Sequence, residues 1–337
     1  MPAHTPWQDR STPEAPPLPF PPLIVICGAT ATGKTELALG LAEQIRGAEI
    51  ISADSRQVYR GMDIGTAKVP AADRARVPHH GLDLVEPDQR FTAADYRRVA
   101  LEALHQIGEA GGVALLVGGT GLYLRAVARG VALEDTGRDA TVRAGLEHRL
   151  AGEGLHSLVA QLRSGAPDIA ARTDLKNPRR VIRALERATV VGDRPPPPPR
   201  GYPARSVWIG LRIESSENAR HIDDRARAQF EGGLLEEAAG LRRRYDVSLP
   251  AFSAVGYREA FAALDGILTT DQAIDLTATR TRQLARRQRT WFRAEHDIHW
   301  LDASAEPFSS ALPLATELLT EEKTGARSRS ARPPGHD

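Results

Sequence analysis

The first third of the chain alternates between two hydrophobic periods. Apolar runs at 23–27 and 113–117, and the short stretch 49–53, predict buried strands. Apolar residues at helical spacing follow the first run, and others follow Thr92, a residue type that caps helices. Strands that alternate with helices in this way predict the α/β class, with a parallel sheet flanked by helices.

The rest of the chain is mostly helical in pattern. Residues 135–205 are polar and rich in arginine, and they contain the proline run 195–199, which predicts a stiff extended connector. An apolar run at 207–213 predicts a strand that returns to the sheet, before helices at about 219–245 and 271–293. The predicted organisation is a disordered tail at 1–22, the first part of the α/β core at 23–135, an inserted all-helical subdomain at 136–206, the rest of the core with basic helices at 207–321, and a second disordered tail at 322–337.

Composition narrows the class of protein. The chain has 337 residues, 41% of them hydrophobic, which is enough for a sizeable core. Cys27 is its single cysteine, which excludes an intrachain disulfide and a cysteine-rich zinc site. His79 and His80 have no further ligand at metal spacing, so we interpret them as loop or interface residues. Without a membrane-length apolar run or a signal peptide, we expect a soluble, cytoplasmic monomer.

The most specific motif is a phosphate loop directly after the first predicted strand. Residues 28–35 fit the pattern G-x-x-x-x-G-K-[ST], with a strand before and a helix after. In this motif backbone N–H groups and a helix N-terminus hold phosphate oxygens, the lysine adds positive charge, and the hydroxyl residue binds Mg²⁺. The sequence therefore predicts a polyphosphate site made of Gly28, Ala29, Thr30, Ala31, Thr32, Gly33, Lys34 and Thr35, with Thr35 as the metal ligand, and the motif does not show which polyphosphate binds.

Two further segments end at the same predicted edge of the sheet. Asp54 follows the second strand, where a carboxylate serves as a Mg²⁺ partner or general base, although a turn cap is the alternative. Gly118–Thr120 follow the third strand, where phosphate-loop ATPases carry an acidic metal ligand. These glycines let a base or prenyl chain approach the backbone, or else form a tight turn. The glycine-rich stretch 61–68 predicts another close-approach loop.

Arginine is concentrated in two places. Residues 279–293 hold six arginines, a tryptophan and a phenylalanine, and no acidic residue. On a chain whose net charge is only +1, such a helix predicts a local nucleic-acid surface, and a solvated helix face is the alternative. Arg179, Arg180 and Arg183 form a second basic edge, and residues 254–258 could position a phosphate or stack a base.

Together these segments resemble the tRNA dimethylallyltransferase family (tRNA isopentenyltransferases), in its bacterial type. Five motifs carry the resemblance: GATATGKT, DSRQVYRGMDIGTAK, LLVGGTGLYLRA, AVGYRE and RQLARRQRTWFR, within residues 23–303. The family resemblance implies a core like that of P-loop NTPases with an inserted helical domain, and a need for Mg²⁺. It also implies that a dimethylallyl group moves from dimethylallyl diphosphate to the N6 amine of the adenosine 3′-adjacent to the anticodon in the tRNA anticodon stem-loop.

The resemblance implies roles for single residues. Asp54 matches the general base, and Thr120 and Arg143 match positions that contact the substrates in the channel. The residues that match tRNA contacts are Asp54, Ser55, Arg56, Gln57, Arg179, Arg180, Arg183, Ser253, Gly256, Tyr257, Arg258, Arg286, Arg287, Gln288, Arg289, Trp291 and Arg293. Departures from the family pattern at Ala29, Thr32, Ser253 and Ala254 leave individual RNA contacts open.

Two other hypotheses remain from the residues alone. An isopentenyltransferase or kinase that acts on free adenine nucleotides would use the same phosphate loop. An RNA-binding protein without catalysis would use the loop as a nucleotide switch. The basic helix at 279–293 favours RNA over a free nucleotide, and the strand that ends in Gly-Gly-Thr disfavours ATP hydrolysis.

Overall fold

A parallel sheet of six strands forms the centre of the molecule. The computed structural model describes residues 20–133, 139–194 and 196–330. Within these residues the strand order is β3-β2-β4-β1-β5-β6, and every neighbouring pair is parallel. The strands are β1 (Leu23–Gly28), β2 (Ala48–Ser52), β3 (His79–His80), β4 (Val113–Gly118), β5 (Ser206–Arg212) and β6 (Ile298–Asp302). The predicted α/β class is confirmed.

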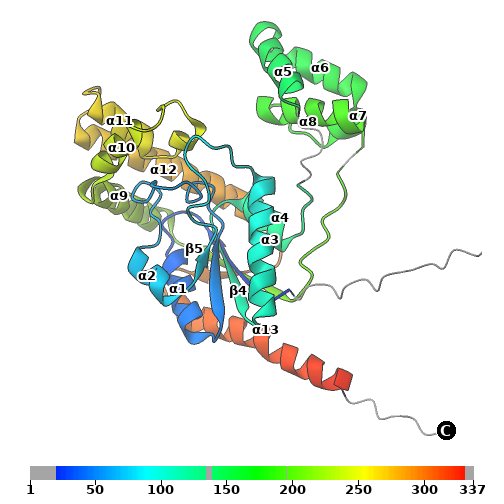
Figure 1. The fold of residues 1–337 in the computed structure, drawn as a ribbon, viewed down its shortest axis with the longest axis vertical. Helices are drawn as coiled ribbons and strands as arrows, with labels where there is room; N and C mark the ends of the chain where they lie inside the picture. Colours follow the sequence, from blue (N-terminus) through cyan, green and yellow to red (C-terminus); the bar gives the residue numbers. More distant parts are fainter. Residues whose placement is uncertain (1–19, 134–138, 195, 331–337) are drawn as a thin grey trace, which may run out of the picture.

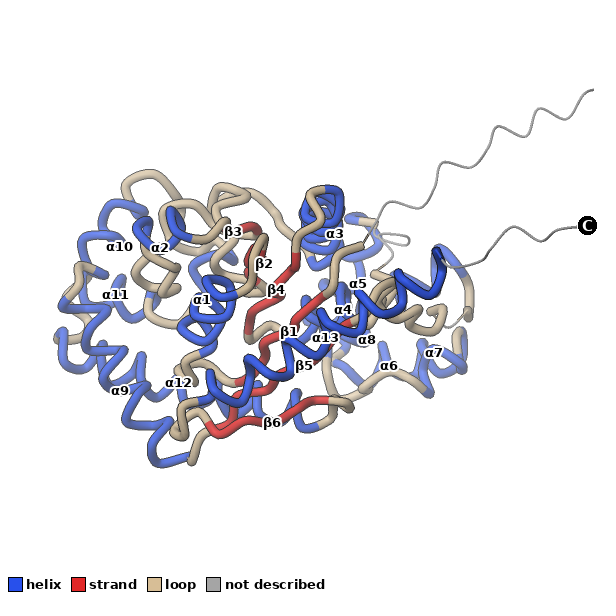
Figure 2. Tube along the Cα trace, turned by 90° about the horizontal axis from the view of Figure 1, so that it is seen from below, coloured by secondary structure: helices blue, strands red, loops and turns tan. Residues whose placement is uncertain are grey.

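Helices cover both faces of this sheet (Figure 2). The helices are α1 (Lys34–Gln44) and α13 (Pro307–Ser330) on one face, and α3 (Ala93–Glu109) and α4 (Gly121–Ala128) on the other. In β1, Ile24 and Ile26 pack with α1 and α13, whereas Leu23 and Val25 pack with α3 and α4. Because successive side chains of a strand point to opposite faces, a strand covered on both sides is apolar at every position.

A second helical layer lies over the carboxyl edge of the sheet (Figure 1). It contains α9 (Ser215–Glu231), α10 (Leu234–Arg242), the 3₁₀ turn Pro250–Ser253, α11 (Tyr257–Leu264) and α12 (Thr270–Arg293). Its core includes Val58 and Met62, which follow β2. The single helix predicted at 219–245 is wrong, because Gly232 and Gly233 separate α9 from α10 and Gly233 has a φ of 101°.

A separate helical body is inserted between α4 and β5 (Figure 1). It consists of α5 (Ala140–Glu153), α6 (Leu155–Gly165), α7 (Pro167–Ala171) and α8 (Pro178–Val191). Leu158, Leu162 and Val181 are fully buried in a core of its own. Asn177 caps α8 by accepting from two backbone N–H groups, and Pro178 occupies its first turn. This part of the chain is therefore helical, as predicted.

The chain ends depart from the prediction of disordered tails. Phe20 packs against His105 and Tyr202, so the fold begins before residue 23. Helix α13 spans Pro307–Ser330, so it extends past residue 322, where the second tail was predicted to begin. Residues 1–19 and 331–337, where the remaining tail predictions fall, lie outside the described residues.

Three short elements have no clear signal in the sequence. Helix α2 (Ala71–Arg76) and strand β3 are too brief for a periodic pattern, and β6 is only partly buried. His79 and His80 pair with Ile50 and Ile51 of β2, so they extend the sheet instead of lying in a loop. Across the described ranges, the structure contains no helix with both the length and the apolar character needed to cross a membrane.

The packing of the sheet predicts a large effect of one methyl group. A Cβ at Gly118 would overlap the backbone carbonyl of Ala53, so Gly118→Ala should destabilise the protein by about 3 kcal/mol. Urea unfolding measures the change. The matched control is Gly145→Ala in α5, where no atom lies within 4 Å and helix propensity should add up to about 1 kcal/mol. A stable Gly118→Ala protein would contradict the close approach.

Candidate active site

The phosphate loop joins β1 to α1, as its motif predicts. Gly28, Ala31 and Gly33 have φ angles of 146°, 59° and 78°. These angles curl the backbone around the N-terminus of α1. Gly28 and Gly33 adopt them without a Cβ clash, whereas Ala31 is a non-glycine residue in the left-handed region. At Gly28 a Cβ would also meet the backbone carbonyl of Leu211 on β5. The loop is thus shaped both by its own glycines and by the neighbouring strand.

Lys34 is the buried cation of the loop. Its Nζ donates to the carbonyl of Ala29 at 2.5 Å and lies in the same cavity as Thr35 and Asp54. Burial, together with the nearby positive charge of Arg225, lowers the pKa of Lys34 to about 8, against the opposing effect of Asp54. A bound anion would raise the pKa of Lys34 again, because it would stabilise the protonated ammonium.

Helix α9 holds the loop through two residues that sequence reasoning missed. The Nδ2 of Asn218 donates to the carbonyls of Thr30 and Ala31 at 3.1 and 3.2 Å. Arg225 donates to the Thr30 hydroxyl at 3.3 Å, and burial lowers the pKa of its guanidinium. Arg289 donates to Asn218 Oδ1 at 2.9 Å, so this predicted tRNA contact supports the loop instead. A charged helix like α9 resembles an ordinary solvated helix, so only the fold reveals its buried face.

Asp54 lies where β2 ends. One carboxylate oxygen accepts the N–H of Arg56 at 2.8 Å, which is the turn-capping contact considered as an alternative. Asp54 nevertheless lines the cavity that also contains Lys34 and Arg225. The turn fixes the orientation of the carboxyl group and leaves its second oxygen for chemistry. Capping and catalysis are therefore compatible at this position.

The Gly-Gly-Thr turn after β4 packs against Asp54 and its neighbours. Thr120 Oγ1 accepts the N–H of Ser55 at 3.1 Å. The space that a Cβ would occupy at Gly118 is filled by the Ala53 backbone, and at Gly119 by the amide of Gln288. The close approach that these glycines allow is therefore made by the protein itself, and the tight-turn interpretation holds.

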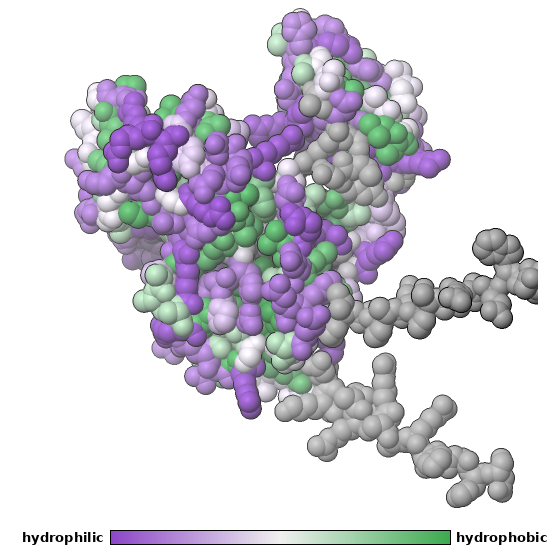
Figure 3. Space-filling model, in the orientation of Figure 1, coloured by the Kyte–Doolittle hydropathy of each residue, from purple (hydrophilic) through white to green (hydrophobic). Residues whose placement is uncertain are grey.

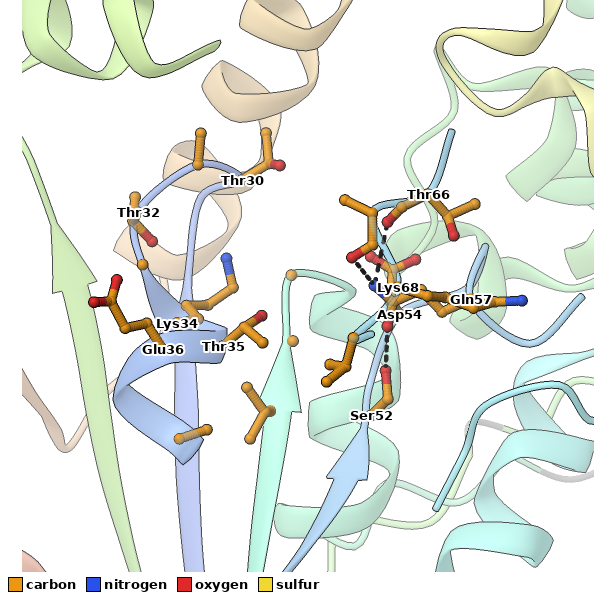
Figure 4. Close-up of a pocket in the computed structure, with 18 of the residues that line it drawn as sticks. Thr30, Thr32, Lys34, Thr35, Glu36, Ser52, Asp54, Gln57, Thr66 and Lys68 are labelled. Atoms are coloured by element: carbon orange, nitrogen blue, oxygen red, sulfur yellow. Dashed lines mark hydrogen bonds between the residues drawn. The ribbon is translucent and has the colours of Figure 1, made fainter. Parts of the chain in front are cut away.

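Two cavities meet at Asp54. The loop-side cavity, about 360 Å³, lies between the phosphate loop and residues 66–70, and Figure 4 shows Lys34 and Thr35 across from Asp54. The helix-side cavity, about 250 Å³, lies between Asp54, Thr120 and helices α9 and α12. The residues that line both cavities are Thr30, Asp54, Thr66, Arg225 and Gln288. The carboxyl group of Asp54 thus stands between two chambers.

The side-chain oxygen atoms near the phosphate loop suit a metal ion that is bound together with a phosphate group of the substrate. In the described ranges, no group of three or more His, Cys, Asp or Glu side chains is arranged to hold a metal. Thr35 and Asp54 are oxygen donors in the loop-side cavity. Mg²⁺ is commonly held by one or two protein oxygens together with substrate phosphates and waters. The role of Thr35 as a metal ligand stays a prediction.

Arg289 of α12 donates to Asn218 of α9, and the other five arginines of the helix fall into two groups. Arg280 and Arg282 form ion pairs with acidic residues of α11 and α9. Arg286, Arg287 and Arg293 are exposed, and no ion pair among the described residues involves them. The compensating acids, absent from residues 279–293, are supplied by neighbouring helices. Only the second group is available to bind a phosphate backbone.

Two other residues predicted to contact tRNA from α12 pack against the core. Gln288 accepts the N–H of Thr30 at 2.8 Å and donates to the carbonyl of Gly119 at 3.1 Å. Trp291 lies against Gly121, and Arg125 stands over its ring at 5.1 Å. Gln288 still lines both cavities, and Trp291 lines a shallow cavity with Arg286 and Arg287.

The segment around Tyr257 is mostly buried. The Tyr257 ring is fully buried and its hydroxyl donates to Glu237 at 2.6 Å. The structure therefore contradicts the predicted tRNA contact of Tyr257, because the ring has no surface for a base. Gly256 is also buried, and its φ of 104° starts α11. Arg258 is exposed, and Ser253 lines the helix-side cavity.

The residues after Asp54 are tied to other loops. Arg56 donates to the carbonyl of Pro250 and to the hydroxyl of Ser253, both at 3.0 Å. Gln57 uses its amide to hold Ser52 and the 66–67 backbone. Ser55 and Arg56 line the helix-side cavity, whereas Gln57 lines the loop-side cavity. The structure thus places Gln57 on the side of the phosphate loop, where its predicted tRNA contact stays a prediction.

Residues of the inserted subdomain lie apart from the cavities. Arg143 bonds to Glu147 and Glu186 at 3.0 and 3.3 Å, and it lines neither cavity. The structure does not bring Arg143 to Asp54, so its predicted substrate contact would require the subdomain to move toward the core. Arg179, Arg180 and Arg183 lie on α8, with the first two exposed. Their predicted tRNA contacts stay predictions.

His79 is a cavity residue that sequence reasoning assigned to a loop or interface. It lines the loop-side cavity, and its Nδ1 is 2.7 Å from the carbonyl of Val77. Burial lowers the pKa of His79, and its Nε2 is buried without a partner among the described residues. The adjacent His80 bonds to Glu49 at 2.6 Å instead. Adjacent strand residues face opposite sides of the sheet, which separates these two histidines.

Comparisons with known proteins agree with this geometry. The model of the IPP transferase family matches residues 57–295. The chain belongs to the IPP transferase family. It is 42% identical to the tRNA dimethylallyltransferase of Geobacter metallireducens, over 83% of this chain and 92% of that protein. It is also 42% identical to that of Anaeromyxobacter dehalogenans, over 85% of this chain and 96% of that protein.

Solved structures place the fold in the same family. The tRNA isopentenylpyrophosphate transferase of Bacillus halodurans superposes with a TM-score of 0.68 at 36% identity, over 90% of this chain and 99% of that chain. A eukaryotic dimethylallyltransferase solved acting on tRNA gives a TM-score of 0.75 at 22% identity, over 89% of this chain and 80% of that chain. The second comparison supports the fold alone.

The lowered pKa of Lys34 predicts pH-dependent anion binding. Since the free ammonium loses its proton near pH 8, affinity for Mg²⁺-diphosphate should fall as pH rises from about 7 to about 9.5, and binding near pH 8 should take up a proton. Calorimetry in buffers of different ionisation enthalpy measures both effects. In Lys34→Met the proton uptake should disappear. Affinity that is constant across this range would contradict the assignment.

Proposed function

We propose that this chain transfers a dimethylallyl group from dimethylallyl diphosphate to the exocyclic N6 amine of the adenosine 3′-adjacent to the anticodon of tRNA, with release of diphosphate. The single observation that carries the proposal is the position of Asp54, at the wall shared by the loop-side and helix-side cavities. A carboxylate in that position can serve one substrate on each side. The names of its close relatives support the same reaction.

The chemistry needs a base on one side of the reacting carbon and an anion site on the other. The N6–C1 bond forms while the C1–oxygen bond to diphosphate breaks, and the N6 proton passes to Asp54. The amine of adenine is a weak nucleophile because its lone pair is delocalised into the ring. Proton removal by a positioned carboxylate therefore contributes directly to the rate.

The loop-side cavity supplies the anion site. Lys34, Arg225 and the N-terminus of α1 surround it with positive charge. Negative charge develops on the diphosphate oxygens as the carbon leaves, so fixed cations stabilise the transition state more than the bound substrate. Mg²⁺, when bound with diphosphate near Thr35, would neutralise part of the same charge. The cations of the chain would orient the leaving group away from Asp54.

The helix-side cavity and the surface around it suit RNA. Figure 3 shows an open notch between the inserted subdomain and the layer of α9 to α12. Exposed arginines lie on both lobes, with Arg179 on one and Arg286 and Arg287 on the other. The target base must leave its stack to reach Asp54, at a cost of a few kcal/mol, and phosphate contacts would offset this cost. A tRNA substrate would place the protein in the cytoplasm.

A free adenine nucleotide is the competing acceptor. It would fit the two cavities, but it would leave the basic lobe at α8 without a role. The deciding assay incubates the protein and Mg²⁺ with labelled dimethylallyl diphosphate and either unmodified tRNA, AMP or ATP. We expect label on tRNA alone. Label on AMP instead would favour the nucleotide enzyme, and tRNA binding without any transfer would favour the non-catalytic hypothesis.

Removal of the base should separate catalysis from binding. Asp54→Asn keeps the size of the side chain and the turn contact with Arg56, but it cannot accept the N6 proton. We expect transfer to fall by about 10²-fold or more, while tRNA affinity changes less than about threefold. Single-turnover kinetics and filter binding measure the two quantities. Normal turnover at saturation would contradict the base assignment.

The exposed arginines of α12 should contribute counterion release. Arg286→Gln and Arg287→Gln should each weaken tRNA binding and lower the slope of log affinity against log salt by about 0.7–0.9 per lost phosphate contact. The control is Arg46→Gln, an exposed arginine that follows α1 at the opposite edge of the sheet. If both variants show the same salt slope as the wild type, Arg286 and Arg287 of α12 do not contact the tRNA backbone.

A further inference from the structure

The loop of residues 62–68 has no regular secondary structure, yet its backbone is held at nearly every position. On the side of the sheet, Gln57 donates from its Nε2 to the carbonyls of Thr66 and Ala67, both at 3.2 Å. Lys68, whose side chain is 1% exposed, donates to the carbonyl of Tyr59 at 2.5 Å. Buried backbone groups outside helices and sheets need such partners. This half of the loop is therefore fixed to the core.

Helix α9 holds the middle of the same loop. The Nε2 of Gln229 donates to the carbonyl of Ile64 at 2.7 Å and to that of Gly65 at 3.1 Å. Gln229 also lines the helix-side cavity. Glutamine amides from two different parts of the fold thus take the carbonyls of residues 64–67, and the carbonyls of Met62 and Asp63 accept from Thr66 and Lys68 of the same loop. The backbone N–H groups of residues 63–65 remain to be paired.

Glu237, in α10, takes those donors. Its carboxylate accepts the N–H groups of Asp63, Ile64 and Gly65 at 2.9, 2.8 and 3.1 Å. Three successive N–H groups that point at one centre form an anion-binding nest. Here the anion is a side chain of the same protein, and hydrogen bonds to a charged carboxylate are about twice as strong as neutral ones.

Tyr257 completes the contact from α11. Its hydroxyl donates to Glu237 at 2.6 Å, and its fully buried ring occupies the space over Gly65, where a Cβ would overlap it. The ring therefore requires glycine at this position of the loop. The glycine-rich stretch 61–68 therefore allows a close approach, as predicted, and the group that approaches it is the Tyr257 ring of the protein itself.

The clamped loop lines parts of both cavities, and its Thr66 belongs to the wall that they share. Gly65 and Thr66 line the helix-side cavity, and Thr66, Ala67 and Lys68 line the loop-side cavity. Glu237 lines neither cavity. We propose that Glu237 is a positioning residue for the transfer reaction, because its carboxylate fixes the 62–68 loop and so the shape of both chambers beside Asp54. The inference rests on the proposed function for its kinetic readout.

The test compares Glu237→Gln with Glu236→Gln, its exposed neighbour in α10, which carries the same charge. A glutamine keeps the shape but offers one acceptor oxygen, and its NH₂ group opposes the N–H donors. We expect faster hydrogen exchange at the amides of residues 63–65 and a kcat lowered by about tenfold to a hundredfold, since small displacements of a site are costly. tRNA affinity and the Glu236→Gln protein should match the wild type.

Tyr257→Phe provides a graded second variant. It removes one hydrogen bond to Glu237 and leaves the three from the loop, so amide protection and kcat should both fall between wild type and Glu237→Gln. Thermal unfolding confirms that each variant is folded at the assay temperature. Rapid exchange with unchanged kcat, or protected amides in Glu237→Gln, would overturn the proposal. Absence of transfer in the wild type would instead count against the proposed function.

Discussion

The site depends on how closely the ends of β2 and β4 approach each other. The N–H of Ala53 donates to Val117 at 2.7 Å, and the N–H of Thr120 donates back to the carbonyl of Ala53 at 3.2 Å. This pairing leaves no room for a side chain at Gly118. It places Asp54 at the carboxyl edge of the sheet, beside the phosphate loop. Every contact of the two cavities is arranged around that fixed carboxyl group.

The two cations near Asp54 are partly removed from solvent, and this determines their electrostatic behaviour. Lys34 and Arg225 are cations held in a poorly solvated cavity, and burial lowers the pKa of both. Such a cavity is costly without an anion and becomes favourable when a diphosphate fills it. Binding of the diphosphate would relieve the unfavourable burial of these two cations, and this gain in free energy would add to its affinity. The same reasoning explains why the two cations come from different helices, because one helix could not surround a ligand.

Helix α12 serves two surfaces at once. Its inner side carries Gln288, which connects the phosphate loop to the Gly-Gly-Thr turn, and its outer side carries Arg286 and Arg287. Successive positions on a helix differ by about 100° in direction, so residues one or two positions apart can face the core and the solvent respectively. From sequence, all of these residues were candidates for one RNA surface. The fold divides them into those that hold the loop and those that remain exposed.

The sequence by itself determined the α/β class, the phosphate loop and the importance of Asp54, because each is encoded by neighbouring residues with a strong local pattern. The structure alone decided the roles of Arg225, Glu237 and Tyr257. Their contacts join segments far apart in the chain, and a buried arginine or carboxylate has the same local pattern as a solvated one. Tertiary packing brings Arg225 to the cavities and Glu237 and Tyr257 to the loop beside them, and that placement has no local signal.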